Sequence, residues 1–135
     1  NAVLRYLCLK HDLQAWYPHE LKTRATTEQW LDWNQCLLAP CVENIVLHGV
    51  FLGAQGDPAR VDLGHTQWQE REAILDSALA ITPYLCGDQP TIADLSVASN
   101  IFQLGIADAE PAGSSLQRWY DAMASLQGFQ KSLPK

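Results

Sequence analysis

Residues 87–103 read GDQPTIADLSVASNIFQ, which combines the signals for a helix start with a long apolar run. Thr91 suits an N-cap position and Asp94 follows three residues later, so each side chain can accept the other's free backbone N–H. Pro90 prevents the helix from extending upstream because its ring fixes φ. A helix that is apolar on all sides is buried, so this segment is predicted to be the central helix of the fold. The apolar residues, which would lie on nearly all sides of this helix, are Ile92, Ala93, Leu95, Val97, Ala98, Ile101, Phe102, Leu104 and Ile106.

The rest of the chain predicts further helices around this one. Residues 20–52 carry an apolar stripe at helical spacing, and Pro40 inside it predicts a kink or break near Ala39–Pro40. Residues 51–64 are predicted as a loop, followed by a helix from residue 61 or 67 to residue 84. A short helix is expected around residues 116–126, and residues 128–135 are expected as a tail that Pro134 keeps from extending. Because no alternating β-branched run occurs, the fold class is predicted as all-α, a bundle of five to six helices.

Composition and charge exclude several classes of protein. The chain has 135 residues, of which 47% are hydrophobic and five are tryptophan, and this excludes a disordered protein. The net charge of −6, without a basic cluster, argues against nucleic acid or an anionic membrane surface as a partner. No apolar run reaches the ~18 residues that a membrane span needs, so no membrane association is expected.

The cysteines and histidines show no metal-ligand spacing. Cys8, Cys36, Cys41 and Cys86 form no CxxC motif, so free, buried or half-buried thiols are expected. Free thiols indicate a reducing compartment, and a cytoplasmic location is predicted. The four histidines are scattered singly, which favours incidental histidines over a metal site.

The first residues of the chain suggest part of a larger element. Residues 2–10 are helical in composition and begin without a cap. Residues 12–19 form a connector whose segment WYP (16–18) provides an aromatic anchor and a stop; composition leaves open whether it is an interdomain linker or an ordinary loop. The first helix has an apolar face made of Val3, Leu4 and Leu7. If no other domain covers this face, we expect the chain to self-associate through residues 2–17.

Several segments, in the same order, resemble the C-terminal domain of the glutathione transferases. The capping box at Thr91 and Asp94 matches the N-capping motif that the family carries on its sixth helix. The other matching segments point to the theta or theta-like class: Asn1–Leu7, Trp16–Pro18, Leu21–Arg24, Trp30–Trp33, Phe102–Leu104 and Gly128–Gln130. The resemblance implies three parts: residues 1–11 as the remnant of the last helix of a thioredoxin-like domain that is missing here, residues 12–19 as the interdomain linker, and residues 20–135 as the helical domain.

The resemblance implies an activity for a longer chain. In the family, the thioredoxin-like domain binds most of the glutathione and carries the hydroxyl that activates its thiol, a serine in theta enzymes. A complete chain would therefore conjugate glutathione to small hydrophobic electrophiles, or reduce peroxides with it, as a homodimer without a metal. No group among the 135 residues is suited to stabilising a thiolate, so no catalytic residue is assigned and these residues alone are expected to be inactive. The alternative is a stand-alone, non-catalytic helical domain for protein interaction.

The resemblance also places four residues, Cys36, Ala39, Glu43 and Leu47, on the wall of the electrophile pocket. Their spacing by three and four residues would put them on one helical surface, and the alternative is that they are ordinary surface or packing residues. Some theta enzymes have an arginine and a tryptophan where Ala39 and Leu47 stand here, so a sulfate-ester substrate is not expected. Thr91 and Asp94 are assigned a structural capping role. The tryptophans expected in the core are Trp30, Trp33, Trp68 and Trp119.

Overall fold

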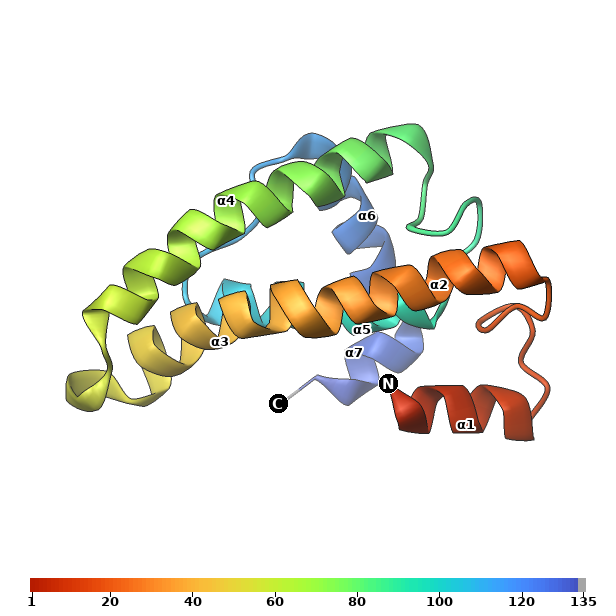
Figure 1. Cartoon of the computed structure of the whole chain (residues 1–135), viewed down its shortest axis with the longest axis horizontal. Coiled ribbons are helices and arrows are strands. Elements are labelled where there is room, and N and C mark those ends of the chain that lie inside the picture. Colours follow the sequence, from red (N-terminus) through yellow and green to blue (C-terminus); the bar gives the residue numbers. More distant parts are fainter. Residues whose placement is uncertain (134–135) are drawn as a thin grey trace.

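The computed structural model describes residues 1–133, and all their regular structure is helical (Figure 1). The α-helices in this range are α1 (Ala2–Lys10), α2 (Leu21–Trp33), α3 (Ala39–Val46), α4 (Pro58–Ile81), α5 (Ile92–Ile106), α6 (Ser114–Ala124) and α7 (Gln127–Ser132). Two π-helical turns flank α3, namely η1 (Asn34–Leu38) and η2 (Leu47–Phe51), and a 3₁₀ turn, η3 (Gly53–Gln55), precedes α4. No β-strand occurs in residues 1–133, which confirms the predicted all-α class.

The central position predicted for residues 92–106 is confirmed. α5 packs against α2 and α3 and also against α6, while α4 contacts α3 and α6. Figure 1 shows α2 and α3 as one long rod, with α4 crossing the molecule on one side of it and α1 lying on the other. The bundle that follows α1 therefore has a central helix surrounded on several sides, and α1 is peripheral to it.

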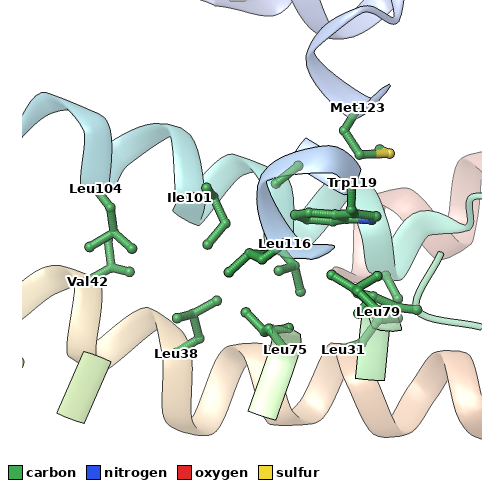
Figure 2. Packing of buried hydrophobic residues seen from close by; sticks show 14 of the residues in the cluster. Leu31, Leu38, Val42, Leu75, Leu79, Ile101, Leu104, Leu116, Trp119 and Met123 are labelled. Atoms are coloured by element: carbon green, nitrogen blue, oxygen red, sulfur yellow. The ribbon is translucent and has the colours of Figure 1, made fainter. Parts of the chain in front are cut away.

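Apolar side chains from the surrounding helices meet on α5 to form the core (Figure 2). Trp119 is completely buried, and Trp68 is buried as well. Trp30 and Trp33 are half-buried and stack edge to face, with ring centroids 5.4 Å apart. The side chains that Figure 2 labels are all buried: Leu31, Leu38, Val42, Leu75, Leu79, Ile101, Leu104, Leu116, Trp119 and Met123. Burying one such side chain contributes roughly 1.5–3 kcal/mol, so this cluster is the main source of stability.

The rod formed by α2, η1 and α3 is continuous across Pro40, so of the predicted kink or break, the break does not occur. Pro40 has no N–H to complete an α-helical turn. A wider π turn precedes this proline, and in it the N–H of Ala39 donates to the carbonyl of Asn34. Pro40 therefore lies in the first turn of α3, directly after the π turn.

Two other boundaries differ from the sequence-based expectation. α4 begins at Pro58, and the carboxylate of Asp57 caps it by accepting the N–H of Ala59 at 3.0 Å, so most of the expected loop is helical. Gly64 does not end a loop; it lies inside α4, where this helix crosses α3 closely. Residues 127–132 form α7 where a tail was expected, and Pro134 lies outside the described residues.

The capping box at the start of α5 is confirmed, and its carboxylate also accepts hydrogen bonds from residues outside the box. Asp94 accepts the backbone N–H of Thr91 at 2.8 Å, and the hydroxyl of Thr91 accepts the N–H of Ala93 at 3.2 Å. Asp94 also accepts the N–H of Leu85 at 3.0 Å and the indole N–H of Trp119 at 2.8 Å. Burial raises the pKa of Asp94, while these hydrogen bonds act in the opposite direction. The side chain thus joins the start of α5 to the preceding loop and to α6.

Candidate functional site

A cavity of about 780 Å³ lies between α1, the η1 turn, α5 and α7. Its apolar wall includes Leu4, Trp16, Leu95, Leu126 and Phe129. Its polar lining consists of asparagine, glutamine and serine side chains, and no Lys, Arg, His, Asp or Glu lines it within the described chain. A volume of this size suits a small organic molecule or the side chains of a packed element. The neutral lining favours an uncharged, largely apolar occupant.

A chain of hydrogen bonds between neutral side chains forms one side of the cavity. Asn100 donates to the side-chain oxygen of Asn34, and the Asn34 amide donates in turn to the hydroxyl of Ser96, both at 2.9 Å. Ser96 then donates to the side-chain oxygen of Asn1, also at 2.9 Å. Because Asn34 is buried, these bonds satisfy polar groups that would otherwise destabilise the fold. The relay holds η1, α5 and the start of α1 in fixed positions around the cavity.

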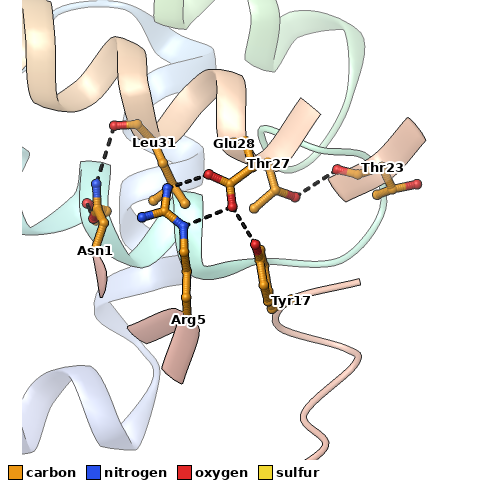
Figure 3. A network of polar contacts seen from close by, with 8 residues as sticks. Asn1, Arg5, Tyr17, Thr23, Thr27, Glu28 and Leu31 are labelled. Atoms are coloured by element: carbon orange, nitrogen blue, oxygen red, sulfur yellow. Dashed lines mark hydrogen bonds and ion pairs between the residues drawn. The ribbon is translucent and has the colours of Figure 1, made fainter. Parts of the chain in front are cut away.

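A second polar cluster fastens α1 and the connector to α2 (Figure 3). Arg5 and Glu28 form an ion pair in which Nε of Arg5 donates to Oε1 of Glu28 at 2.9 Å. The hydroxyl of Tyr17 donates to the same oxygen at 2.5 Å. The Arg5 hydrogen bond lowers the pKa of Glu28, whereas burial raises the pKa of Tyr17.

The aromatic anchor expected in residues 12–19 is present. Tyr17 is buried, and the guanidinium of Arg24 lies over its ring at 4.5 Å from the centroid. The carbonyl of Trp16 accepts the N–H of Ile92 at 2.9 Å, which joins the connector to the start of α5. The connector is therefore held on the bundle by its aromatic residues, and Trp16 forms part of the cavity wall.

The structure does not bring the four predicted wall residues together in this cavity. Ala39 lines it, whereas Cys36 and Glu43 are exposed and Leu47 is half-buried on the same rod, none of them in the lining. The π turn η1 changes the register between Cys36 and Ala39, because a π turn takes more residues than an α turn. Glu43 and Leu47 follow Ala39 at spacings of four residues, but the cavity lining on this rod ends at Ala39. The pocket role of Cys36, Glu43 and Leu47 stays a prediction.

Sequence reasoning missed the polar relay. From the sequence, no role is assigned to Ser96, Asn100 or Asn34. A signal was available, because an amide on an otherwise apolar stripe requires a hydrogen-bonding partner once it is buried. The identity of that partner depends on how α5 docks on η1.

All four cysteines are free, but the expectation that each is buried or half-buried is wrong for one of them. Cys8 and Cys41 are buried, Cys86 is half-buried and Cys36 is exposed. Burial raises the pKa of Cys41 to about 11, and its thiol donates to the carbonyl of Gly64 at 3.3 Å. A thiol with a raised pKa is a poor nucleophile, so Cys41 is suited to packing rather than to chemistry.

In residues 1–133, no group of three or more His, Cys, Asp or Glu side chains is arranged to hold a metal ion. No helix in the same range has both the length and the apolar character that a bilayer crossing requires.

Comparisons with known proteins agree with this architecture. Residues 58–122 match the family model described as the C-terminal domain of glutathione S-transferase. Glutathione S-transferase GstB from Escherichia coli (strain K12) is 26% identical over 135 residues, which cover 97% of this chain. The chain spans 64% of the length of GstB.

Two crystal structures of the theta class glutathione S-transferase from the citrus canker pathogen Xanthomonas axonopodis pv. citri resemble this fold. The apo form has a TM-score of 0.87 and 30% sequence identity, and the match covers 96% of this chain and 69% of that chain. The form with glutathione bound has a TM-score of 0.90 and 29% identity, and the match covers 99% of this chain and 65% of that chain.

Proposed function

This chain belongs to the glutathione S-transferase family, and we propose that it is the helical part of a theta-like transferase. The complete enzyme conjugates glutathione to small hydrophobic electrophiles, or reduces peroxides with it. The likeness to a theta class structure that holds glutathione supports this proposal. In this scheme glutathione is a substrate bound mainly by a thioredoxin-like domain, and residues 20–135 supply part of the electrophile pocket.

The observation that carries the proposal is the cavity beside α1. It contains Ala39 from the predicted pocket wall, and its apolar side chains suit a hydrophobic electrophile. Among the described residues, its lining has no Lys, Arg or His side chain that would stabilise a thiolate. The role proposed for this chain is therefore to hold and orient the electrophile, while activation of the glutathione sulfur falls to another domain.

The exposed apolar side of α1 supports the proposal that another domain packs against this helix. Val3 is 69% exposed, and Tyr6 and Leu9 are more than half exposed, although α1 is tethered to the bundle through Arg5 and Asn1. Exposed apolar residues on one helix mark a surface suited to a partner. We propose that residues 1–11 belong to the thioredoxin-like domain, that residues 12–19 link the two domains, and that the enzyme is a homodimer in the cytoplasm, in keeping with its free thiols.

The first test is the intact mass of the protein purified at its native length, together with a conjugation assay. The assay measures glutathione-dependent loss of an aralkyl halide and of an organic hydroperoxide. Turnover by a protein larger than these 135 residues supports the proposal. A native protein of this length, folded but inactive with both substrates, would instead support the alternative of a non-catalytic interaction domain, whose binding surface would be the exposed side of α1.

A pair of matched substitutions tests the role of the cavity in the native-length enzyme. Ala39→Trp places a large ring in the cavity and should raise the KM for a bulky electrophile, with little effect on the KM for glutathione. Ala25→Trp adds the same ring at an exposed position of α2 outside the cavity and should leave both constants unchanged. Equal effects of the two variants would contradict the proposed pocket.

A further inference from the structure

A second cavity, of about 540 Å³, lies between the C-terminal half of α5, the connection to α6, and α6 itself. It shares no lining residue with the first cavity. Its apolar part consists of Ile101, Phe102, Ile106 and Pro111. This volume is large enough for a small organic ligand, and the apolar lining would stabilise a hydrophobic group.

The charged groups of this second cavity are all acidic. Glu110 and Asp121 line it, and no Lys, Arg or His does so within residues 1–133. The basic residue nearest in sequence, Arg118, is held elsewhere because its guanidinium donates to the carbonyl of Leu79 in α4 at 2.7 Å. Neither carboxylate forms an ion pair with the part of the chain that the structure describes. The cavity therefore has two uncompensated negative charges at its edge.

The end of α5 adds to this negative potential. The last residues of the helix, Gly105 and Ile106, line the cavity, and the last turn of α5 contains no basic residue. Carbonyl groups at a helix C-terminus carry a partial negative charge that favours cations within about one turn. Three sources of negative potential, from two carboxylates and one helix end, thus meet at one apolar cavity.

Two aromatic rings complete the lining. Phe102 from α5 and Tyr120 from α6 are half-buried and line the cavity. The hydroxyl of Tyr120 has no hydrogen-bond partner among the described residues, so it is available to a ligand. Aromatic faces attract alkylammonium groups, and the attraction is stronger where neighbouring carboxylates share the cation.

We propose that this cavity binds small organic cations that carry an apolar group, such as tertiary or quaternary ammonium compounds. The apolar group would occupy the space lined by Ile101 and Pro111, and the ammonium would lie towards Glu110 and Asp121. The arrangement disfavours anions. The site is therefore distinct in location and in ligand charge from the electrophile pocket proposed above, and it does not depend on that proposal.

The test is an NMR titration of the full chain with benzyltrimethylammonium, followed through backbone amides. Saturable shifts are expected at Gly105, Ile106 and Tyr120, with a dissociation constant of about 1 mM, as suits one small cation at a partly open site. Benzyl alcohol and phenylacetate, which carry the same ring with no charge or a negative charge, should bind more weakly. Equal binding of benzyl alcohol, saturation at amides away from this cavity, or no saturation up to about 10 mM would overturn the proposal.

Matched variants test the carboxylates. Glu110→Gln combined with Asp121→Asn should weaken binding about tenfold, since each charge contributes modestly at a partly exposed site. Asp62→Asn combined with Asp88→Asn removes the same charge from exposed positions outside the cavity, and it should change the dissociation constant less than about twofold. Equal weakening by both pairs would show a general effect of net charge and would also overturn the proposal.

Discussion

The indole N–H of Trp119 donates to Oδ1 of Asp94 at 2.8 Å, and both side chains are completely buried. The same carboxylate accepts the N–H of Leu85 and both the N–H and the hydroxyl of Thr91. Asp94 therefore joins the first turn of α5 to the preceding loop and to α6. A capping box is usually a local device, but here it also fixes how two helices pack.

We expect Asp94→Ala to lower the free energy of unfolding by about 3 kcal/mol, because four buried donors lose their acceptor. Urea denaturation monitored by circular dichroism measures this loss. Asp88→Ala, an exposed acidic residue upstream of the same helix, is the control and should cost no more than about 0.5 kcal/mol. A loss of only about 1 kcal/mol for Asp94→Ala would show that the carboxylate acts as a local cap alone.

Gly64 lies where α3 and α4 pack closely. A Cβ at this position would lie 2.7 Å from Cγ1 of Ile45 and 3.2 Å from the carbonyl of Cys41. We expect Gly64→Ala to destabilise the protein by about 2 kcal/mol, because the clash outweighs the better helix propensity of alanine. Gly128→Ala in α7, where no atom lies within 4 Å of the added Cβ, should cause no loss. A melting temperature that rises for Gly64→Ala would reject the close-packing argument.

The central helix was predictable from sequence because its signals are local. The capping residues Thr91 and Asp94 are three apart, and the apolar residues of α5 follow directly. The π turn before Pro40 was not predictable from the same pattern. A proline indicates only that one backbone hydrogen bond is missing, and the packing of the rod against α4 and α5 decides whether the helix breaks or widens.

The candidate site was predictable only in part, because it too depends on how the helices pack against one another. Ala39 lines the cavity together with its sequence neighbours Asn34 and Gln35, but most of the other lining residues come from α1, α5 and α7, which are distant in sequence. Asn34 meets Asn100 across 66 positions of the chain. Such pairings depend on how the helices dock, whereas spacing along one helix reports only which side chains share a face.

Two carboxylates on α4 take the place of a side-chain cap on α6. The N-cap residue of α6 is Gly113, which has no side chain to accept a hydrogen bond. Oδ1 of Asp76 accepts the N–H of Leu116 at 2.9 Å, and Oε1 of Glu72 accepts the N–H of Gly113 at 2.9 Å and that of Ala112. Negative charge at a helix N-terminus is stabilising, so α4 both caps α6 and fixes its starting point.

We expect Asp76→Ala to lower the free energy of unfolding by about 1 kcal/mol, the usual cost of losing an N-terminal cap. Equilibrium denaturation provides the measurement. Asp62→Ala makes the same exchange at an exposed position of the same helix and should change stability by about 0.5 kcal/mol or less. Equal losses in the two variants would point to a general charge effect on α4 instead of a cap on α6.

The attachment of α1 to the bundle should depend on the charge of Glu28. Arg5 lowers the pKa of this carboxyl from its ordinary value of 4.5, so the folded state holds the charged form more strongly than the unfolded state does. The resulting stabilisation is fully present above pH 4.5 and is lost as the pH falls through the lower, folded pKa. Glu28→Gln should mimic the acid state at neutral pH and weaken the docking of α1 by about 1 kcal/mol.

Hydrogen exchange measured by mass spectrometry, corrected for intrinsic rates, tests this prediction on α1, with α5 as the internal reference. At pH 7, Glu28→Gln should raise exchange in α1 about fivefold and leave α5 unchanged, because about 1 kcal/mol corresponds to that factor. Glu43→Gln, which removes a charge from an exposed position of α3, should have no effect on α1. In the unmodified protein, the protection of α1 against exchange should decrease as the pH is lowered below 4.5. In Glu28→Gln, the protection of α1 should not change with pH over this range. Parallel pH profiles for the two proteins would show that other contacts, such as Asn1 with Ser96, hold α1 in place.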